Sequence, residues 1–153
     1  MFIYRIADIL RKHKVSYAIV GGFAVALHGA VRGTMDLDLV IKTTKKDFVA
    51  LEKALLSIGM TPRLPVKAEQ IFDYREEYIK NRNLIAWSFY NEKSPAEIVD
   101  IIITHDLRKM KIDKLKVHGK ILCVLAIGDL IKMKNDSGRP QDLLDIEALE
   151  KLK

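Results

Sequence analysis

Residues Tyr17 to Ile41 read YAIVGGFAVALHGAVRGTMDLDLVI, and this stretch decides the fold. It begins with a short apolar run typical of a buried strand, breaks at Gly21-Gly22, and continues as FAVALHG, which has helical composition. A second strand-like run, DLDLVI, ends the stretch. Because side chains alternate across a strand, Asp36 and Asp38 are predicted to project from one face and the aliphatic residues from the other.

Two carboxylates this close repel each other, and each raises the pKa of the other. A hard divalent cation such as Mg²⁺ would neutralise them, since it takes carboxylate oxygens and keeps positions open for phosphate. In the alternative interpretation, Asp36 and Asp38 lie at an exposed strand edge, where solvated charge prevents pairing with another strand.

Asp100 favours the metal interpretation, because it is the only charge in the aliphatic run IVDIII. A lone carboxylate in a buried strand costs several kcal/mol unless it is paired or bound to metal. A pair with Arg or Lys from a neighbouring segment would also satisfy it. On a strand beside Asp36 and Asp38, it would complete a site for two cations, which activate an attacking hydroxyl and neutralise a leaving phosphate.

The paired glycines add a candidate phosphate site. Gly21-Gly22 closes a strand and opens a helix, so backbone N–H groups can face an anion, and the absence of side chains allows close approach. A bare Gly-Gly pair is also common in purely structural turns. Thirteen residues separate Gly22 from Asp36, enough for one short helix and a return into the adjacent strand, so the turn is predicted to lie beside the carboxylates.

The rest of the chain predicts an α/β fold with a mixed sheet flanked by helices. Periodicity predicts helices over residues 3–13 and 45–59, strands over 84–90 and 96–104, and a hairpin over 114–124, while residues 69–81 fit either a helix or a strand. A helical pair, 126–136 and 139–153, ends the chain, and the apolar stripe of its last helix is Leu143, Ile146, Leu149 and Leu152. We expect one domain over residues 1–153.

Composition indicates an ordinary globular protein, with 49% apolar and 30% charged residues. The net charge of +6 raises the chance of a polyanionic partner such as RNA, although the lysines are spread along the chain as on a plain solvated surface. The single Cys123 suits a reducing, cytoplasmic setting. No apolar run approaches the ~20 residues of a membrane span, and the N-terminus lacks the pattern of a signal peptide.

The stretch from Val20 to Ile41 resembles the nucleotidyltransferase superfamily typified by DNA polymerase beta and the kanamycin nucleotidyltransferases. Their pattern is a Gly-Gly or Gly-Ser turn, a short helix, Asp-x-Asp and a later strand carboxylate. Small stand-alone bacterial and archaeal members, including AbiEii-like toxin nucleotidyltransferases, are more similar still. These members share an Arg-x-Thr-x-Asp-x-Asp run, which is matched here by Arg32, Thr34, Asp36 and Asp38. They also share a C-terminal Lys followed by Gly-Arg-Pro-x-Asp-Leu-x-Asp, which is matched by Lys134, Arg139, Asp142 and Asp145.

The resemblance implies a Mg²⁺-dependent enzyme that transfers a nucleoside monophosphate from an NTP to an acceptor hydroxyl. Asp36, Asp38 and Asp100 would be catalytic and hold one or two Mg²⁺ ions. Nucleotide-binding residues would be Gly21, Gly22, Arg32, Thr34, Lys134 and Arg139. Lys134 and Arg139 could instead form salt bridges, and Asp142 and Asp145 could orient them.

The acceptor would be RNA such as tRNA, a protein or a small molecule. The alternatives are a non-catalytic nucleotide- or RNA-binding module of the same fold and a toxin controlled by a cognate antitoxin. The chain departs from the pattern at Gly22, where many active members carry Ser. It also has little room for the helical domain with which many relatives recognise the acceptor.

Overall fold

The strand–turn–helix–strand unit predicted from the sequence forms the centre of the sheet. The computed structural model describes residues 1–153. Strand β1 (Tyr17–Val20) leads directly into helix α2 (Gly21–Leu27), and β2 (Leu37–Ile41) returns antiparallel to β1 with Asp38 opposite Val20. The helix begins at the glycines, two residues earlier than its apolar composition indicated.

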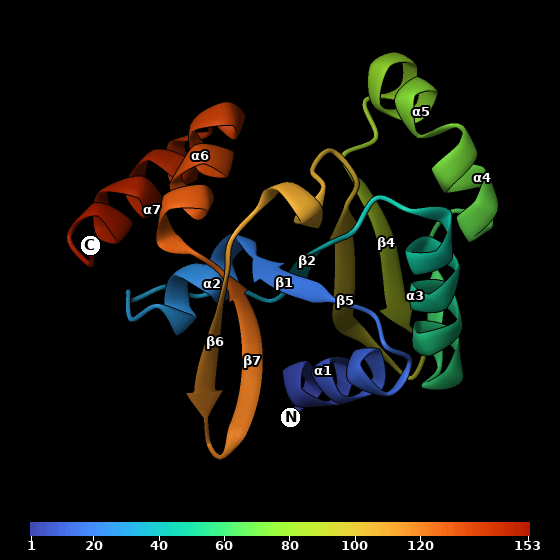
Figure 1. The fold of residues 1–153 in the computed structure, drawn as a ribbon, viewed down its shortest axis with the longest axis horizontal. Coiled ribbons are helices and arrows are strands. Elements are labelled where there is room, and N and C mark those ends of the chain that lie inside the picture. The colour runs from blue at the N-terminus through green and yellow to red at the C-terminus, as the bar shows by residue number, and fades with distance from the viewer.

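Seven strands form one mixed sheet in the order β3-β4-β5-β2-β1-β7-β6 (Figure 1). Strand β5 runs parallel to β2 and β7 parallel to β1, whereas the other pairs are antiparallel. The remaining strands are β3 (Met60–Pro62), β4 (Ala86–Asn91), β5 (Ser94–Ile102), β6 (Ile112–Val117) and β7 (Lys120–Leu125). The predicted mixed α/β architecture is therefore confirmed, and residues 60–62 add a short strand.

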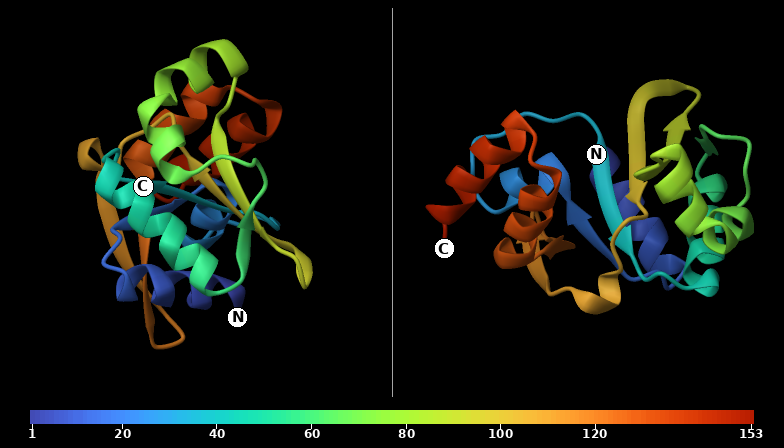
Figure 2. Two further views of the ribbon diagram at one scale, coloured as in Figure 1. Left: turned by 90° about the vertical axis from the view of Figure 1, so that its right-hand side faces the viewer. Right: turned by 90° about the horizontal axis from the view of Figure 1, so that it is seen from above.

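The helices gather in two groups at opposite ends of the sheet (Figures 1 and 2). One group, at the β3–β4 end, contains α3 (Lys45–Ser57), α4 (Ala68–Asp73) and α5 (Arg75–Arg82). The other is the predicted C-terminal pair, α6 (Ile127–Ser137) and α7 (Pro140–Glu150); α1 (Phe2–Lys12) and a 3₁₀ turn, η1 (Leu107–Lys109), complete the fold. None of these helices has the length and apolar character required to cross a bilayer.

An aromatic cluster fills the core beneath α3. The ring of Trp87 is fully buried, stacks on Phe48 with ring centroids 5.7 Å apart, and lies 4.9 Å from the ring of Phe89. Such pairs add to the free energy gained by burying aromatic area. Trp87 is therefore a core residue of β4.

We expect Thr44→Ala to destabilise the protein by about 1 kcal/mol, because it removes the N-cap of α3. The Thr44 hydroxyl accepts a hydrogen bond from the Asp47 amide over 3.1 Å. Thr44→Ser keeps this hydroxyl and is the matched control. Thermal denaturation should show a loss of about 2–4 °C for Ala and little change for Ser; equal effects of both would contradict the cap.

Helix α7 differs from its sequence pattern. Of the predicted apolar stripe, Leu149 is fully buried and Ile146 packs partly against the core, whereas Leu143 is 59% exposed and Leu152, beyond the end of α7, is 40% exposed. The buried side chains are Asp142, Asp145 and Leu149. Hydrophobic periodicity did not predict Asp142 and Asp145 on the buried face, because these aspartates are buried as partners of basic side chains.

Candidate active site

Asp38 and Asp100 occupy neighbouring strands in matched register. Asp38 lies on β2 and pairs with Asp100 of the parallel strand β5, while Asp36 directly precedes β2. Burial, the charges of Asp100 and Asp36, and a hydrogen bond with Asp100 raise the pKa of Asp38 to about 7, against the opposing charge of Lys134. The structure thus holds Asp38 where negative charge exceeds positive charge.

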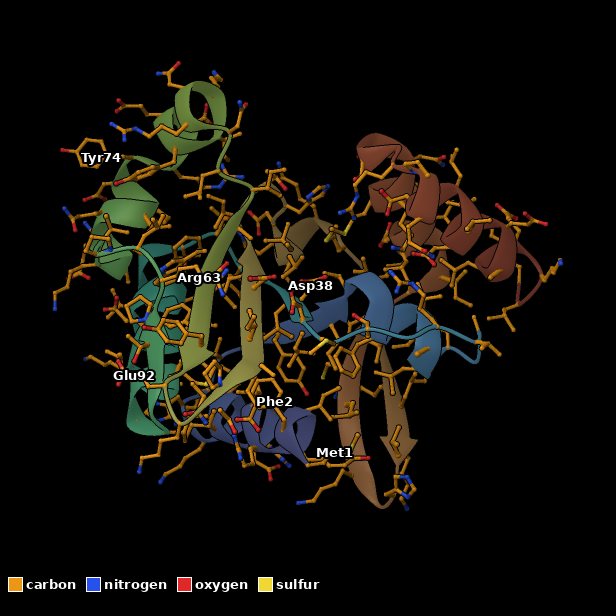
Figure 3. All side chains as sticks on the ribbon, turned by 180° about the vertical axis from the view of Figure 1, so that it is seen from behind. Met1, Phe2, Asp38, Arg63, Tyr74 and Glu92 are labelled. Carbon is orange, nitrogen blue, oxygen red and sulfur yellow. The ribbon has the colours of Figure 1, made fainter.

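Asp36 is more exposed than Asp38, but burial and Asp100 shift its pKa in the same direction. Partial burial and the charge of Asp100 raise its pKa, while Arg63 lowers it. Arg63 follows β3 and was not predicted as a site residue, because only the pairing of β3 with β4 brings it near Asp36. Figure 3 shows Asp38 near the middle of the molecule, between the strands and the C-terminal helices.

Ser88 on β4 supports Asp100. Its hydroxyl donates a hydrogen bond to Asp100 Oδ1 over 2.6 Å, and the two residues are direct partners across the strands. The polar partners of Asp100 are thus the Ser88 hydroxyl and the Asp38 carboxyl, and not the Arg or Lys of the alternative interpretation. Ser88 was not predicted as a site residue, although its position between the buried Trp87 and Phe89 indicated a polar side chain on the opposite face of β4.

Both glycines of the turn are in tight contact with predicted site residues. Gly21 has a φ of +67°, and a Cβ placed there would overlap the Asp38 carboxylate. A Cβ at Gly22 would lie 2.8 Å from Thr34 Cβ, 2.9 Å from Thr34 Oγ1 and 3.2 Å from Arg32 Cζ. Close packing alone therefore requires both glycines, and residues 28–36, here called the Arg32 loop, lie directly over the turn.

Basic residues of the site form ion pairs with the buried aspartates of α7. Lys134 Nζ lies 2.9 Å from Asp145 Oδ2 and 3.4 Å from Asp142 Oδ1. Arg139 Nε lies 2.9 Å from Asp142 Oδ2, and Arg32 Nε lies 3.0 Å from Asp145 Oδ1. The salt-bridge interpretation of Lys134 and Arg139 is therefore confirmed; their nucleotide contact stays a prediction.

These contacts keep Asp142 and Asp145 ionised. Burial alone would raise the pKa of each carboxyl, but hydrogen bonds from Arg139 and Ser137 lower the pKa of Asp142 well below its usual range. The charge of Lys134 and a hydrogen bond from Gln141 lower the pKa of Asp145. Each aspartate is therefore a permanent negative charge that fixes the position of a neighbouring cation.

A cleft of about 320 Å³ opens beside Asp38. Its polar walls include Gly21, Asp38, Lys134 and Arg139, and its apolar lining includes Ile102. The other predicted residues lie outside the cleft wall. Asp36 and Asp100 are neighbours of Asp38, and Arg32 and Thr34 cluster at Gly22 of the turn. The tertiary structure therefore brings the predicted residues into two adjoining clusters.

The donor chemistry of the carboxylates fits a hard divalent cation. Asp36, Asp38 and Asp100 supply only oxygen ligands, and burial together with the charges of Asp100 and Asp36 raises the pKa of Asp38, a cost that a bound cation would offset. No three acidic, His or Cys side chains are arranged as a ready-made metal-ligand group. The three carboxylates would have to change position to share a cation.

Solved structures of nucleotidyltransferases share this fold. The lincosamide antibiotic adenylyltransferase LnuA, bound to lincomycin, is 14% identical with a TM-score of 0.65, covering 99% of this chain and 96% of that one. The antibiotic-resistance factor ANT(2″)-Ia is 14% identical with a TM-score of 0.63, covering 99% and 80%. An antigenic nucleotidyltransferase-like protein from Paracoccidioides brasiliensis is 18% identical with a TM-score of 0.63, covering 98% and 74%.

No protein-family model matches the chain, and no curated protein matches its sequence. At these identities the likeness concerns the fold, which is that of the nucleotidyltransferases. The closer resemblance to AbiEii-like toxins stays a prediction.

Proposed function

We propose that this protein transfers a nucleoside monophosphate from an NTP to an acceptor hydroxyl. The observation that carries the proposal is the pairing of Asp38 with Asp100 on adjacent strands, beside a cleft whose other wall presents Lys134 and Arg139. Carboxylates on one side and cations on the other suit a triphosphate with its associated metal. The nucleotidyltransferase fold of the structural neighbours supports the same reaction class.

In the proposed reaction, the acceptor oxygen forms a bond to the α-phosphorus of the NTP as the bond from that phosphorus to the pyrophosphate oxygen breaks. Asp100 accepts the proton of the acceptor hydroxyl, and Ser88 holds that carboxylate in place. Asp36 and Asp38 would hold Mg²⁺, with Asp100 as a ligand of a second ion. Bound Mg²⁺ would supply positive charge to the attacking and leaving oxygens.

The remaining predicted residues would bind the triphosphate. Gly21 and Gly22 would admit phosphate oxygens close to the backbone, and Arg32 and Thr34 would donate hydrogen bonds beside them. Lys134 and Arg139 would offset the charge of the leaving pyrophosphate. The guanidinium of Arg139 is available for this role because its side chain is 73% exposed.

Two kinds of acceptor have support. The net charge of +6 favours RNA. Lincomycin in one structural neighbour and adenylyl-2″-tobramycin in another favour a small hydroxyl compound. A protein acceptor, a non-catalytic module and an antitoxin-controlled toxin are the other outcomes that an experiment has to distinguish.

Incubation with α-³²P-labelled NTPs, Mg²⁺ and separate acceptor pools tests the proposal. The pools are total RNA, a protein extract, and hydroxyl-bearing small molecules including lincomycin and tobramycin. We expect label in one pool, none with Asp36→Ala/Asp38→Ala, and unchanged labelling with the surface control Asp113→Asn. Absence of label from every pool would contradict nucleotidyl transfer; NTP binding without label would instead support the non-catalytic module.

A further inference from the structure

We propose that Asp145 is a positioning residue that ties the C-terminal helix pair to the Arg32 loop and thereby holds the nucleotide site together. This inference rests on the proposed function. Asp145 is 2% exposed and lies on α7, over a hundred residues from the loop in sequence. It would touch neither the NTP nor the acceptor, and would act through Arg32 and Lys134.

Both oxygens of the Asp145 carboxylate are in use. Oδ1 accepts hydrogen bonds from Arg32 Nε and Gln141 Nε2, each over 3.0 Å. Oδ2 lies 2.9 Å from Lys134 Nζ, as an ion pair without the alignment of a hydrogen bond. One buried carboxylate therefore joins the Arg32 loop, α6 and α7.

The Arg32 loop has few apolar contacts between Val31 and Asp36. Ala30 packs partly against the core and Leu37 after the loop is buried, but the large side chains of Val31 and Met35 between them are exposed. Hydrophobic packing therefore contributes little between these two points, where the ion pair of Arg32 with Asp145 links the loop to α7. The same loop leads into Asp36, so its position also sets the position of that carboxylate.

The ion pair of Arg32 with Asp145 also determines which side chains lie over the Gly21-Gly22 turn. Arg32 Cζ lies 3.2 Å from the point where a Gly22 Cβ would be, with the Thr34 side chain beside it. Held by Asp145 in this place, Arg32 can direct its remaining guanidinium N–H groups toward an anion near the turn. If the loop were mobile, Arg32 and Thr34 would have to become ordered when the NTP binds. The entropy cost of this ordering would weaken NTP binding.

Stability alone does not account for the burial of so many charges. Replacing a buried ion pair by apolar residues of similar volume is often neutral or stabilising. The ion pairs instead fix the positions of the two basic side chains. Lys134 is held in the cleft wall near Asp38, and Arg32 is held over Gly22. Helices α6 and α7 are then part of the active site.

Asp145→Asn tests the link, because Asn keeps the shape but removes the charge. We expect about a tenfold weaker affinity for Mg-NTP by calorimetry. We also expect faster hydrogen exchange in residues 30–36, a readout that does not depend on catalysis. Glu150→Gln changes an exposed acid on the same helix and should alter neither measurement. Unchanged exchange and unchanged affinity in Asp145→Asn would overturn the proposal.

Arg32→Gln removes the same contact from the loop side. This variant can therefore test the proposal even if Asp145→Asn does not fold. The loss of affinity in the double variant should be smaller than the sum of the two single losses, since both changes remove the Arg32–Asp145 contact. Additive losses would overturn the link. If the wild type bound no NTP, the proposed function would fail, whereas faster loop exchange in either variant would still support the tie to α7.

Discussion

Replacing Asp38 with Asn is expected to abolish nucleotidyl transfer and yet stabilise the folded protein at neutral and alkaline pH. The amide removes a charged oxygen ligand at the centre of the site, and we expect activity to fall by about 10³-fold or more. The same change removes a carboxylate that burial, Asp100 and Asp36 make unfavourable to ionise. Activity and stability therefore change in opposite directions.

The sign of the stability effect follows from the pKa of Asp38. This pKa rises from an ordinary 3.8 to about 7 on folding, so between these values the folded state binds more protons than the unfolded state. Stability of the wild type therefore decreases as pH rises through this window. The Asn side chain does not titrate, so its advantage should be small near pH 4 and reach about 1–3 kcal/mol, or ~3–10 °C, at pH 8.

Thermal denaturation without divalent metal at pH 4, 6 and 8 measures this effect. Added Mg²⁺ should then stabilise the wild type at pH 8 and leave Asp38→Asn nearly unchanged, because the variant lacks the ligand. Asp113→Asn, on the exposed strand β6, is the matched control and should follow the wild type throughout. A melting temperature of Asp38→Asn below that of the wild type at pH 8, or full retained activity, would refute this interpretation.

Gly22→Ser is expected to weaken NTP binding at least tenfold, although many active members of the resembled superfamily carry Ser in this position. The new Cβ would lie 2.8 Å from Thr34 Cβ and 2.9 Å from Thr34 Oγ1. Overpacking of this kind costs about 1–3 kcal/mol, so the melting temperature should fall by ~3–10 °C. Displacement of the Arg32 loop would move Thr34 and Arg32 away from the turn.

A second substitution should reverse this loss. Gly22→Ser/Thr34→Gly removes both clashing atoms and transfers the hydroxyl from the loop to the turn, so NTP affinity should recover most of what Gly22→Ser loses. Gly128→Ser, where an added Cβ meets no atom within 4 Å, is the control for adding a serine side chain. Calorimetric titration with Mg-NTP measures all three variants. Tight binding by Gly22→Ser alone would show that the loop does not compete with a side chain at this turn.

The fold was predictable where local signals were strong. The apolar run before Gly21, the glycine pair and the alternation around Asp38 predicted β1, α2 and β2 correctly, because strand period, turn chemistry and helical composition agree along this stretch. The aliphatic run around Asp100 likewise predicted β5. The catalytic assignments of these residues stay predictions for the experiments above.

Other parts of the site were not predictable from local patterns. Ser88 and Arg63 carry no motif, and they reach Asp100 and Asp36 only through the pairing of β3, β4 and β5. On α7, the apolar stripe predicted the buried Leu149 but not the buried aspartates, because these are compensated by Arg32, Lys134 and Arg139 from outside the regular pattern of the helix.

The sequence alone predicts the central strand–turn–helix–strand unit, the place of Asp38 on a strand and the α/β class, since these depend on side-chain alternation and turn chemistry within a few residues. The tertiary structure alone settles which strands are neighbours, that Asp38 and Asp100 are matched in register, and that the C-terminal helices contribute buried charge to the Arg32 loop. The reason is physical: the energy of a buried charge depends on which partners surround it, and those partners come from distant parts of the chain.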